Sequence, residues 1–225
     1  MKTGYSGIIF DFNGTLFFDS DKQEESWEII SMRLRGRAFG KQEMQRRMHG
    51  RSGKSIFGYL PDDEVLRLMA EKEEIYRELC LKDRERFHLA PGAVELLDWI
   101  KERRIPRTIA TASEIVNVTF FIRSFGLERW FDPEKIVYDD GTLPGKPNPD
   151  IYLKAARTIG LAPSRCVVVE DAVSGIEAAR RAGAGYIVAM DSGATDPAVL
   201  ARLDGVARVI RSFDDFDRNL LTVGA

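Results

Sequence analysis

Gly7-Ile8-Ile9-Phe10-Asp11-Phe12-Asn13-Gly14-Thr15 is the stretch of sequence that decides the fold, because an apolar run ends there in Asp11 and an Asn-Gly turn. A β-branched and aromatic run closed by Asp and Gly predicts a buried strand that ends in a sharp turn. In a parallel α/β sheet the carboxyl ends of the strands line the ligand crevice. A carboxylate there can attack phosphorus or bind a hard metal ion. The alternative is that Asp11 only closes the strand with an Asx-turn.

Five more apolar runs in the chain are typical of buried strands. They are residues 106–110, 135–138, 166–169, 186–190 and 207–210. Helical patterns alternate with them, at residues 93–103, 115–125, 150–159, 174–182 and 197–203. Strands that alternate with helices of this length indicate βαβ units. The sequence therefore predicts an α/β fold with a doubly wound parallel sheet.

One long interval departs from this alternation. Residues 19–89 contain no convincing strand, are dense in charge, and show helical periodicity at residues 24–34, 41–48 and 62–86. Pro91-Gly92 then marks the return to α/β alternation. We expect a discontinuous core of residues 1–18 and 90–225, with an all-helical domain inserted as residues 19–89. An insertion directly after the turn at the active end of the first strand is placed to act as a cap or lid.

The composition excludes several classes of function. The 225 residues are 44% hydrophobic and 30% charged, with a net charge of −2, so nothing favours nucleic acid or an anionic membrane as a partner. No apolar stretch approaches the ~18 residues of a membrane span, and no secretory signal is evident. Cys80 and Cys166 are far apart and flanked by apolar residues. Buried free thiols are consistent with a cytoplasmic protein, and we expect a monomer or a weak homo-oligomer.

Three further polar groups fall at the ends of predicted strands. Thr111-Ala112-Ser113 ends the second strand and opens a helix, where a hydroxyl and backbone N–H groups bind anions; alternatively, Ser113 is simply an N-cap. Lys146 lies in a proline-stiffened loop, where it either pairs with a carboxylate and a phosphate oxygen or only decorates the surface. Glu170-Asp171 closes a buried strand and suits Mg²⁺, which favours few carboxylates plus waters. With only His49 and His88 in the chain, any metal is expected to have oxygen ligands.

These four groups at successive strand ends resemble the motifs of the haloacid dehalogenase superfamily. The similarity is to its phosphatases and β-phosphoglucomutases, which carry a helical cap after the first motif, and it spans nearly the whole chain. Asp11, Thr111, Lys146 and Glu170-Asp171 fall on the four family motifs. The resemblance implies a Rossmann-like core, a Mg²⁺-dependent phosphohydrolase and a small phosphorylated metabolite as the substrate.

The family's roles carry over to matching residues of this sequence. Asp11 would be the nucleophile that forms an aspartyl-phosphate intermediate, and Lys146 would neutralise Asp11 and the phosphate. The metal ligands that the resemblance implies are Asp11, the backbone carbonyl of Asn13, Asp171 and, through water, Glu170. The phosphate-binding groups that it implies are Thr111, the backbone N–H at Ala112 and Lys146.

Asn13 departs from the family pattern, in which this position carries an Asp that serves as the general acid and base. Its backbone carbonyl can still reach a metal ion, but its side-chain amide cannot donate or accept a proton at neutral pH. Loss of a positioned acid or base costs roughly 10²–10⁴-fold in rate. We therefore expect impaired hydrolysis of esters with poor leaving groups, whereas acyl and aryl phosphates need that proton less.

The cap resembles the family less specifically, through His49-Gly50-Arg51-Ser52 and the helix that contains Lys72 and Tyr76. The candidates for contact with the leaving group of the substrate are Arg51, Lys54 and Lys72. Lys72 also lies in the charged run Glu71-Lys72-Glu73-Glu74, which is typical of a solvated helix face.

Two rival functions stay open. One is a β-phosphoglucomutase-like isomerase, which is disfavoured because the phosphate-binding arginine expected in a mutase cap is missing near Gly53. The other is a phosphometabolite-binding protein that has lost turnover, which Asn13 favours and the intact remaining motifs disfavour.

Overall fold

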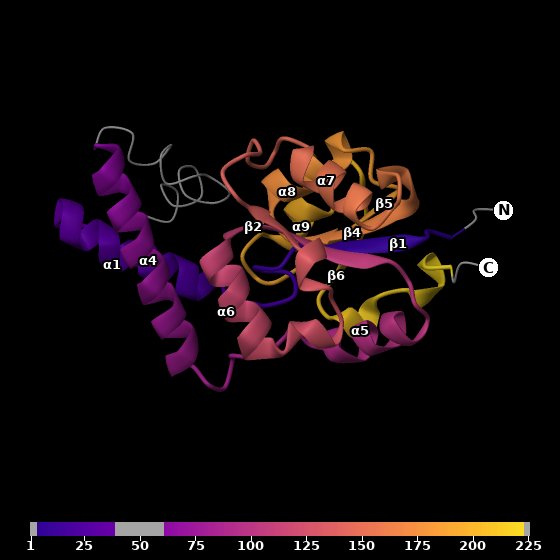
Figure 1. Cartoon of the computed structure of the whole chain (residues 1–225), viewed down its shortest axis with the longest axis horizontal. Helices are drawn as coiled ribbons and strands as arrows, with labels where there is room; N and C mark the ends of the chain where they lie inside the picture. The colour runs from indigo at the N-terminus through magenta and orange to yellow at the C-terminus, as the bar shows by residue number, and fades with distance from the viewer. Residues whose placement is uncertain (1–3, 39–60, 223–225) are drawn as a thin grey trace. The chain divides into compact units, whose positions relative to one another are not determined.

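Six parallel strands form one sheet in the order β3-β2-β1-β4-β5-β6 (Figure 1). The computed structural model describes residues 4–38 and 61–222. The strands are β1 (Gly7–Phe10), β2 (Arg107–Glu114), β3 (Val137–Asp139), β4 (Cys166–Glu170), β5 (Tyr186–Met190) and β6 (Val206–Ile210). The α-helices are α1 (Ser20–Arg35), α4 (Asp62–Lys82), α5 (Ala93–Glu102), α6 (Ile115–Phe125), α7 (Asp150–Thr158), α8 (Val173–Arg181) and α9 (Pro197–Leu200). The predicted α/β fold with a doubly wound parallel sheet is confirmed.

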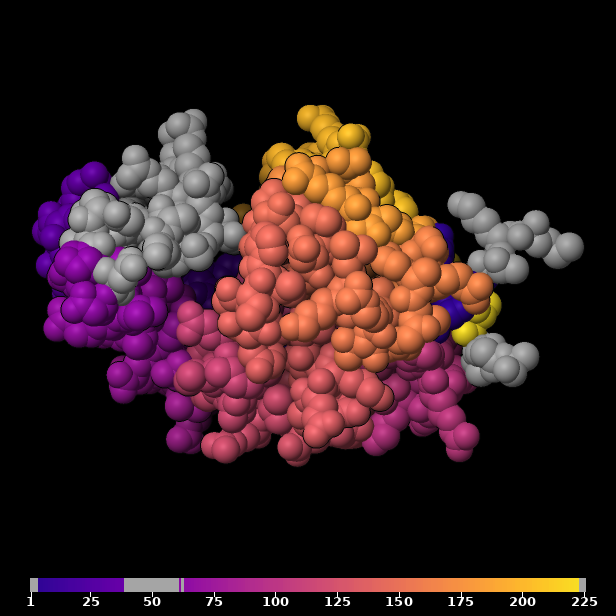
Figure 2. Space-filling model, turned by 45° about the horizontal axis from the view of Figure 1, so that its top comes forward, coloured from indigo at the N-terminus to yellow at the C-terminus, as the bar shows by residue number. Residues whose placement is uncertain are grey.

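Both faces of the sheet are covered, which explains why its central strands are apolar throughout. Ile9 of β1 belongs to a buried cluster with residues of α7, α8 and α9. Phe10 points the other way and meets the rings of Phe131 and Phe213, with centroids 6.2 and 5.8 Å away. Figure 1 shows α7 and α8 on one face and α5 on the other. In Figure 2, which brings the top of Figure 1 forward, segments coloured orange form much of the visible surface of the sheet unit.

The position of β1 in the middle of the sheet fixes where its end residue lies. Phe10 is in register with Ile109 of β2 and Val169 of β4. The N–H of Asp11 then donates to the carbonyl of Val169 at 2.9 Å, one residue beyond the strand. Asp11 is therefore held at the carboxyl edge of the sheet, between the ends of two neighbouring strands.

Two strand boundaries differ by more than one residue from the sequence prediction. β2 does not end at residue 110 but continues to Glu114, with a register irregularity against β3 between Ala110 and Glu114. β3 begins at Val137 rather than residue 135, because Pro133–Lys135 forms a 3₁₀ turn capped by the Asp132 side chain. Short strands with few apolar residues give boundaries that the sequence pattern alone defines poorly.

Residues Asp19–His88 form a second compact unit, distinct from the unit of Met1–Phe18 and Leu89–Ala225. Its described helices are α1 and α4, which pack through one apolar cluster. The members of this cluster are Trp27, Ile30 and Val65, with Leu34, Met69 and Ile75 packed against them. α1 ends at Gly36, whose φ of 67° allows its N–H to bond the carbonyl of Met32. The helix expected at residues 41–48 lies outside the described residues.

Both cysteines are buried and free. Burial raises the pKa of Cys166 to about 11 and that of Cys80 to about 12, so neither thiol carries thiolate character at neutral pH. Among the described residues, no helix is both long and apolar enough to cross a membrane.

Candidate active site

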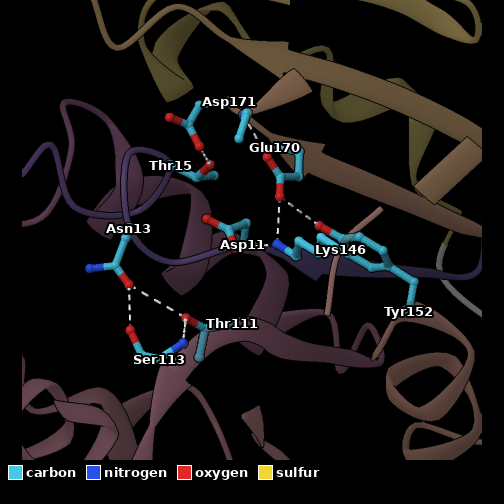
Figure 3. A network of polar contacts seen from close by, with 10 residues as sticks. Asp11, Asn13, Thr15, Thr111, Ser113, Lys146, Tyr152, Glu170 and Asp171 are labelled. Carbon is cyan, nitrogen blue, oxygen red and sulfur yellow. Dashed lines mark hydrogen bonds and ion pairs between the residues drawn. The ribbon is translucent and has the colours of Figure 1, made fainter. Parts of the chain in front are cut away.

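Asp11 and Lys146 are paired at the carboxyl edge of the sheet (Figure 3). Lys146 Nζ donates to Asp11 Oδ1 at 2.7 Å and to Glu170 Oε1 at 2.5 Å. The lysine is only 8% exposed. Burial would lower the pKa of Lys146, but the carboxylates of Asp11 and Glu170 outweigh it and hold that pKa well above its usual value. The lysine is therefore a fixed ammonium ion shared by two acidic side chains.

Glu170 is held by three donors at the end of β4. Its Oε1 accepts from Lys146 and, at 3.2 Å, from the hydroxyl of Tyr152, while its Oε2 accepts from the N–H of Ala172 at 2.7 Å. The ring of Tyr152 also lies 5.2 Å from Lys146 Nζ. Gly175 makes room for this carboxylate, since a Cβ at that position would lie 1.6 Å from Glu170 Oε1. Burial and the neighbouring Glu170 raise the pKa of Tyr152, so its hydroxyl stays protonated and donates.

Asp171 follows β4 and is oriented by two hydroxyl groups. Thr15 Oγ1 donates to its Oδ1 at 3.3 Å, and Ser192 Oγ donates to its Oδ2 at 3.4 Å. Gly14 has a φ of 76° and packs against the same carboxylate, where a Cβ would lie 2.0 Å from Oδ2. The Asn-Gly pair seen in the sequence therefore serves two needs: a left-handed turn and space for Asp171.

The three carboxylates together form a cluster suited to a hard cation. Oxygen atoms of Asp11, Glu170 and Asp171 lie within 4.8 Å of one another, and all three side chains are buried. Lys146 neutralises only part of their combined negative charge. Oxygen-only donors with excess negative charge suit Mg²⁺, and Gly14 and Gly175 leave the room that the carboxylates of Asp171 and Glu170 occupy. The residues present therefore fit the metal that the sequence resemblance implies.

Asn13 faces the end of β2, as Figure 3 shows. Its Oδ1 accepts from Ser113 Oγ at 2.7 Å and from Thr111 Oγ1 at 3.4 Å. Thr111 Oγ1 itself accepts the N–H of Ser113 at 3.1 Å. The interpretation of Ser113 as an N-cap is wrong, because α6 begins at Ile115 and its capping position is Glu114. The cause is the extension of β2, which leaves Ser113 inside the strand and turned to Asn13.

The sequence-predicted candidates fall into three groups. Those that the structure brings together at the carboxyl edge of the sheet are Asp11, Asn13, Thr111, Lys146, Glu170 and Asp171. Ala112 lies beside them in β2 and is exposed. Arg51 and Lys54, together with His49 and Gly53, lie outside the described residues.

Lys72 of α4 is not on a solvated face, because it is only 3% exposed. Its Nζ donates to Glu73 Oε1 at 2.9 Å and to Gln23 Oε1, and lies 5.3 Å from each of the ring centroids of Trp27 and Tyr76. Tyr76 in turn donates to Asp19 at 2.6 Å. The charged run around Lys72 predicts exposure, but two aromatic rings outside that run cover the side chain.

Four residues of the network were absent from the predicted set. They are Thr15, Ser113, Tyr152 and Ser192. Thr15 is part of the first motif, but nothing in that motif says that its hydroxyl reaches Asp171, 156 residues away. Tyr152 occupies a buried position of α7, where an aromatic residue is ordinary core. The signal that could have found these residues is a contact across the fold, which one sequence does not carry.

The chain is similar to a family of known hydrolases. A family model described as haloacid dehalogenase-like hydrolase matches residues 5–183. The phosphorylated carbohydrates phosphatase of Thermotoga maritima is 30% identical over 214 residues, with 90% of this chain and 93% of that protein covered. The hexitol phosphatase A of Escherichia coli is 29% identical, with 92% and 91% covered. A crystal structure of a HAD hydrolase, family IA, variant 3, from Entamoeba histolytica has 35% identity, a TM-score of 0.86 and 96% coverage of both chains.

Proposed function

Because the chain belongs to the haloacid dehalogenase-like hydrolase family, we propose that it is a phosphatase of small phosphorylated carbohydrates that works through Asp11. The family resemblance drawn from the motifs is confirmed by the family match, and the expected class, a phosphohydrolase, by the phosphatases among the relatives. The substrate class follows those relatives, whose names specify phosphorylated carbohydrates and hexitol phosphates.

The observation that carries the proposal is the contact between Asp11 Oδ1 and Lys146 Nζ inside the carboxylate cluster. An oxygen of Asp11 attacks the phosphorus, the bond from phosphorus to the ester oxygen breaks, and its electron pair leaves with that oxygen. Water then attacks the same phosphorus, which releases inorganic phosphate and restores the Asp11 carboxylate. Lys146 compensates charge on the phosphoryl oxygens throughout, because its ammonium group is buried and fixed.

Thr111 and the backbone at Ala112 complete the phosphate site in this proposal. Thr111 is buried at the edge of the sheet, and its hydroxyl faces Asn13. The phosphoryl oxygens that are not transferred would accept from this hydroxyl and from the N–H at Ala112, which orients the phosphorus toward Asp11.

Mg²⁺ is the proposed cofactor, held by Asp11, Asp171 and the backbone carbonyl of Asn13, with Glu170 acting through water. Glu170 suits an indirect role because Lys146 and the N–H of Ala172 hold its two oxygens at 2.5 and 2.7 Å, whereas the hydroxyls that contact the Asp171 oxygens are 3.3 and 3.4 Å away. When bound, the ion screens the negative charge of the incoming phosphate and stabilises charge in the transition state.

Residues 19–89 are proposed to act as a cap that selects the substrate. Lys72 is the candidate from the described residues, and its burial between Trp27 and Tyr76 fixes the direction of its ammonium group. Arg51 and Lys54 belong to the same proposal. Asn13 makes the enzyme atypical, since the amide supplies no proton to a departing alkoxide.

The test is phosphate release from a panel of sugar phosphates and other small phosphorylated metabolites, with Mg²⁺ and after exhaustive EDTA treatment. Release that requires Mg²⁺ and is lost in Asp11→Asn supports the proposal. Full activity in EDTA, or activation by Ca²⁺ equal to that by Mg²⁺, contradicts the metal assignment, because Ca²⁺ takes more ligands at longer distances. Movement of phosphate between sugar positions without release would indicate the mutase. Binding without any turnover would indicate the phosphometabolite-binding protein that Asn13 favours.

A further inference from the structure

We infer that an acyl phosphate phosphorylates Asp11 and that the phosphorylated form is long-lived, because Asn13 supplies no base for its hydrolysis. We call phosphorylation of Asp11 loading and hydrolysis of the phosphorylated Asp11 unloading. The inference rests on the proposed function, because it takes Asp11 as the nucleophile. It goes further because it expects fast loading and slow unloading, and because it names acyl phosphates as the donors for which the two rates differ.

Loading does not need an acid at position 13 when the leaving group is a carboxylate. Asp11 Oδ attacks the phosphorus of the acyl phosphate, the bond to the acyl oxygen breaks, and the electron pair leaves on a carboxylate that is stable as an anion at neutral pH. No proton is transferred in this step. A sugar phosphate differs, because its alkoxide must take a proton as it departs.

Unloading needs a base whatever the donor was. Water attacks the phosphorus of the phosphorylated Asp11, the bond to the Asp11 oxygen breaks, and one water proton must be removed. The Asn13 side chain cannot take that proton. Its only possible help is to orient the water by accepting a hydrogen bond on Oδ1.

The contacts of Asn13 Oδ1 limit that help. Ser113 Oγ donates to it at 2.7 Å, and Thr111 Oγ1 at 3.4 Å. The N–H of Ser113 donates to Thr111 Oγ1 at 3.1 Å, so the Thr111 hydroxyl hydrogen is directed to Asn13 or, once Asp11 is phosphorylated, to a phosphoryl oxygen. The short bond from Ser113 remains in both cases, holds the amide oxygen at β2 and uses one of its two lone pairs. Figure 3 shows the amide oxygen turned to these hydroxyls and the amide nitrogen turned away.

The neighbouring carboxylates are engaged in other contacts. Glu170 accepts from Lys146 and Tyr152 on Oε1 and from the N–H of Ala172 on Oε2. Both oxygens of Asp171 accept hydrogen bonds from hydroxyls, and those of Glu170 and Asp171 belong to the cluster proposed to hold the cation. Within the described part of the chain, these two acids therefore serve the ammonium group and the cation rather than a water molecule.

The experiment uses the full chain with acetyl phosphate as the donor and Mg²⁺ present. After brief incubation the donor is removed by rapid gel filtration, and the mass of the intact protein is followed over time together with inorganic phosphate. We expect a burst of acetate equal to one phosphoryl group per chain, a protein heavier by one phosphoryl group, and slow release of phosphate. In Asn13→Asp the phosphorylated form should decay faster by about 10²-fold or more.

Matched variants make the outcome decisive. Asp11→Asn should take up no phosphoryl group, and peptide mapping of the wild-type protein should place the group on Asp11. The inference is overturned if the wild-type protein releases phosphate as fast as Asn13→Asp, if it takes up no phosphoryl group, or if the group lies elsewhere. If the metabolite panel still shows Mg²⁺-dependent turnover in any of these cases, the proposed function stands without the inference. If the metabolite panel also shows no Mg²⁺-dependent turnover, both the inference and the proposed function are wrong.

Discussion

Two buried lysines in this protein make nearly the same contacts but lie in very different surroundings. Lys146, in the sheet unit, is 8% exposed and contacts Asp11 and Glu170 at 2.7 and 2.5 Å. Lys22, in the helical unit, is 5% exposed and contacts Asp21 and Asp83 at 2.8 and 2.6 Å. Both lysines have a raised pKa, because in each case the two carboxylates outweigh burial.

The difference between the two clusters lies in their partners. Around Lys22 a second cation, Arg86, contacts Asp21 at 2.8 Å and Asp83 at 2.6 Å, so two positive and two negative groups alternate. Around Lys146 the carboxylates of Asp11, Glu170 and Asp171 exceed the positive charge, and all of them are buried. The charges around Lys22 are balanced and partly exposed, so this cluster needs no additional ion. A buried cluster with excess negative charge suits a cation, and the anionic phosphate that the cation brings.

Replacement of one carboxylate in each cluster should give the largest difference in activity between the two clusters. Asp11→Asn removes the attacking oxygen, and we expect turnover of every phosphorylated substrate to fall by on the order of 10⁴-fold or more. Asp21→Asn makes the same chemical change in the helical unit and should leave kcat unchanged. The measurement is phosphate release under saturating substrate, with far-ultraviolet circular dichroism as a check of the fold. Residual activity in Asp11→Asn close to that of Asp21→Asn would place the nucleophile elsewhere.

Asn13→Asp is expected to give the next largest effect, in the opposite direction. The new carboxyl group can protonate a leaving alkoxide, so kcat/KM, which reports the steps up to phosphorylation of Asp11, should rise by about 10²-fold or more for an alkyl phosphate. For p-nitrophenyl phosphate the gain should be smaller, because the aryl oxide departs as an anion. The added negative charge should also weaken substrate binding. Equal gains in kcat/KM with both substrates would mean that position 13 does not supply the proton to the leaving group.

Stability should also distinguish the two lysines. Lys146→Met leaves three buried carboxylates without their ammonium partner, and loss of one member of a buried ion pair costs about 3–5 kcal/mol. Lys22→Met should cost less, because Arg86 remains and Asp21 is 48% exposed on its side chain. Urea unfolding of both variants measures the two losses. A loss in Lys22→Met as large as that in Lys146→Met would contradict the comparison.

The pH dependence of that loss has a definite sign. Because the carboxylates hold the pKa of Lys146 above its ordinary value of 10.5, the folded protein binds this proton more tightly than the unfolded chain. The contribution is whole below pH 10.5 and disappears as the pH rises through the raised pKa. The difference in free energy of unfolding between the wild-type protein and Lys146→Met should therefore be constant from pH 7 to 9 and shrink above 10.5.

Local chemistry explains why much of the core could be predicted from the sequence. The apolar run before Asp11 and the Asn-Gly turn after it are properties of neighbouring residues, and the same holds for Glu170-Asp171 at the end of β4. Alternation of such strands with helices then places their ends at one edge of the sheet. The predicted roles of the site residues stay predictions, although the structure brings Asp11, Lys146 and the two acids together.

Contacts between distant segments explain what the sequence could not provide. Ser113 is in a stretch with weak strand signal, so its place in β2 and its bond to Asn13, 100 residues away, follow only from the folded sheet. The sequence around Tyr152 predicts only a buried helix residue, and its hydroxyl reaches Glu170 at the end of β4 because α7 packs over the neighbouring strands β1 and β2. Lys72 is surrounded by charge in the sequence, yet it is covered by Trp27 from another helix.

Lys72 carries the smallest and most specific expected effect. Its ammonium group is held by Gln23 and Glu73 and lies over the rings of Trp27 and Tyr76, so its position is fixed. If residues 19–89 act as a cap, Lys72→Ala should raise KM for the preferred metabolite more than for p-nitrophenyl phosphate, whose aryl group asks little of the cap. Lys72→Met keeps the aliphatic stem between the rings, so it should raise KM in the same selective way while losing less stability than Lys72→Ala. Lys82→Ala is the matched control, because that lysine is at the end of the same helix with a side chain 72% exposed. Lys72→Ala could instead change KM equally for both substrates while Lys72→Met leaves KM unchanged. That result would show that Lys72 acts only through the packing of its aliphatic stem.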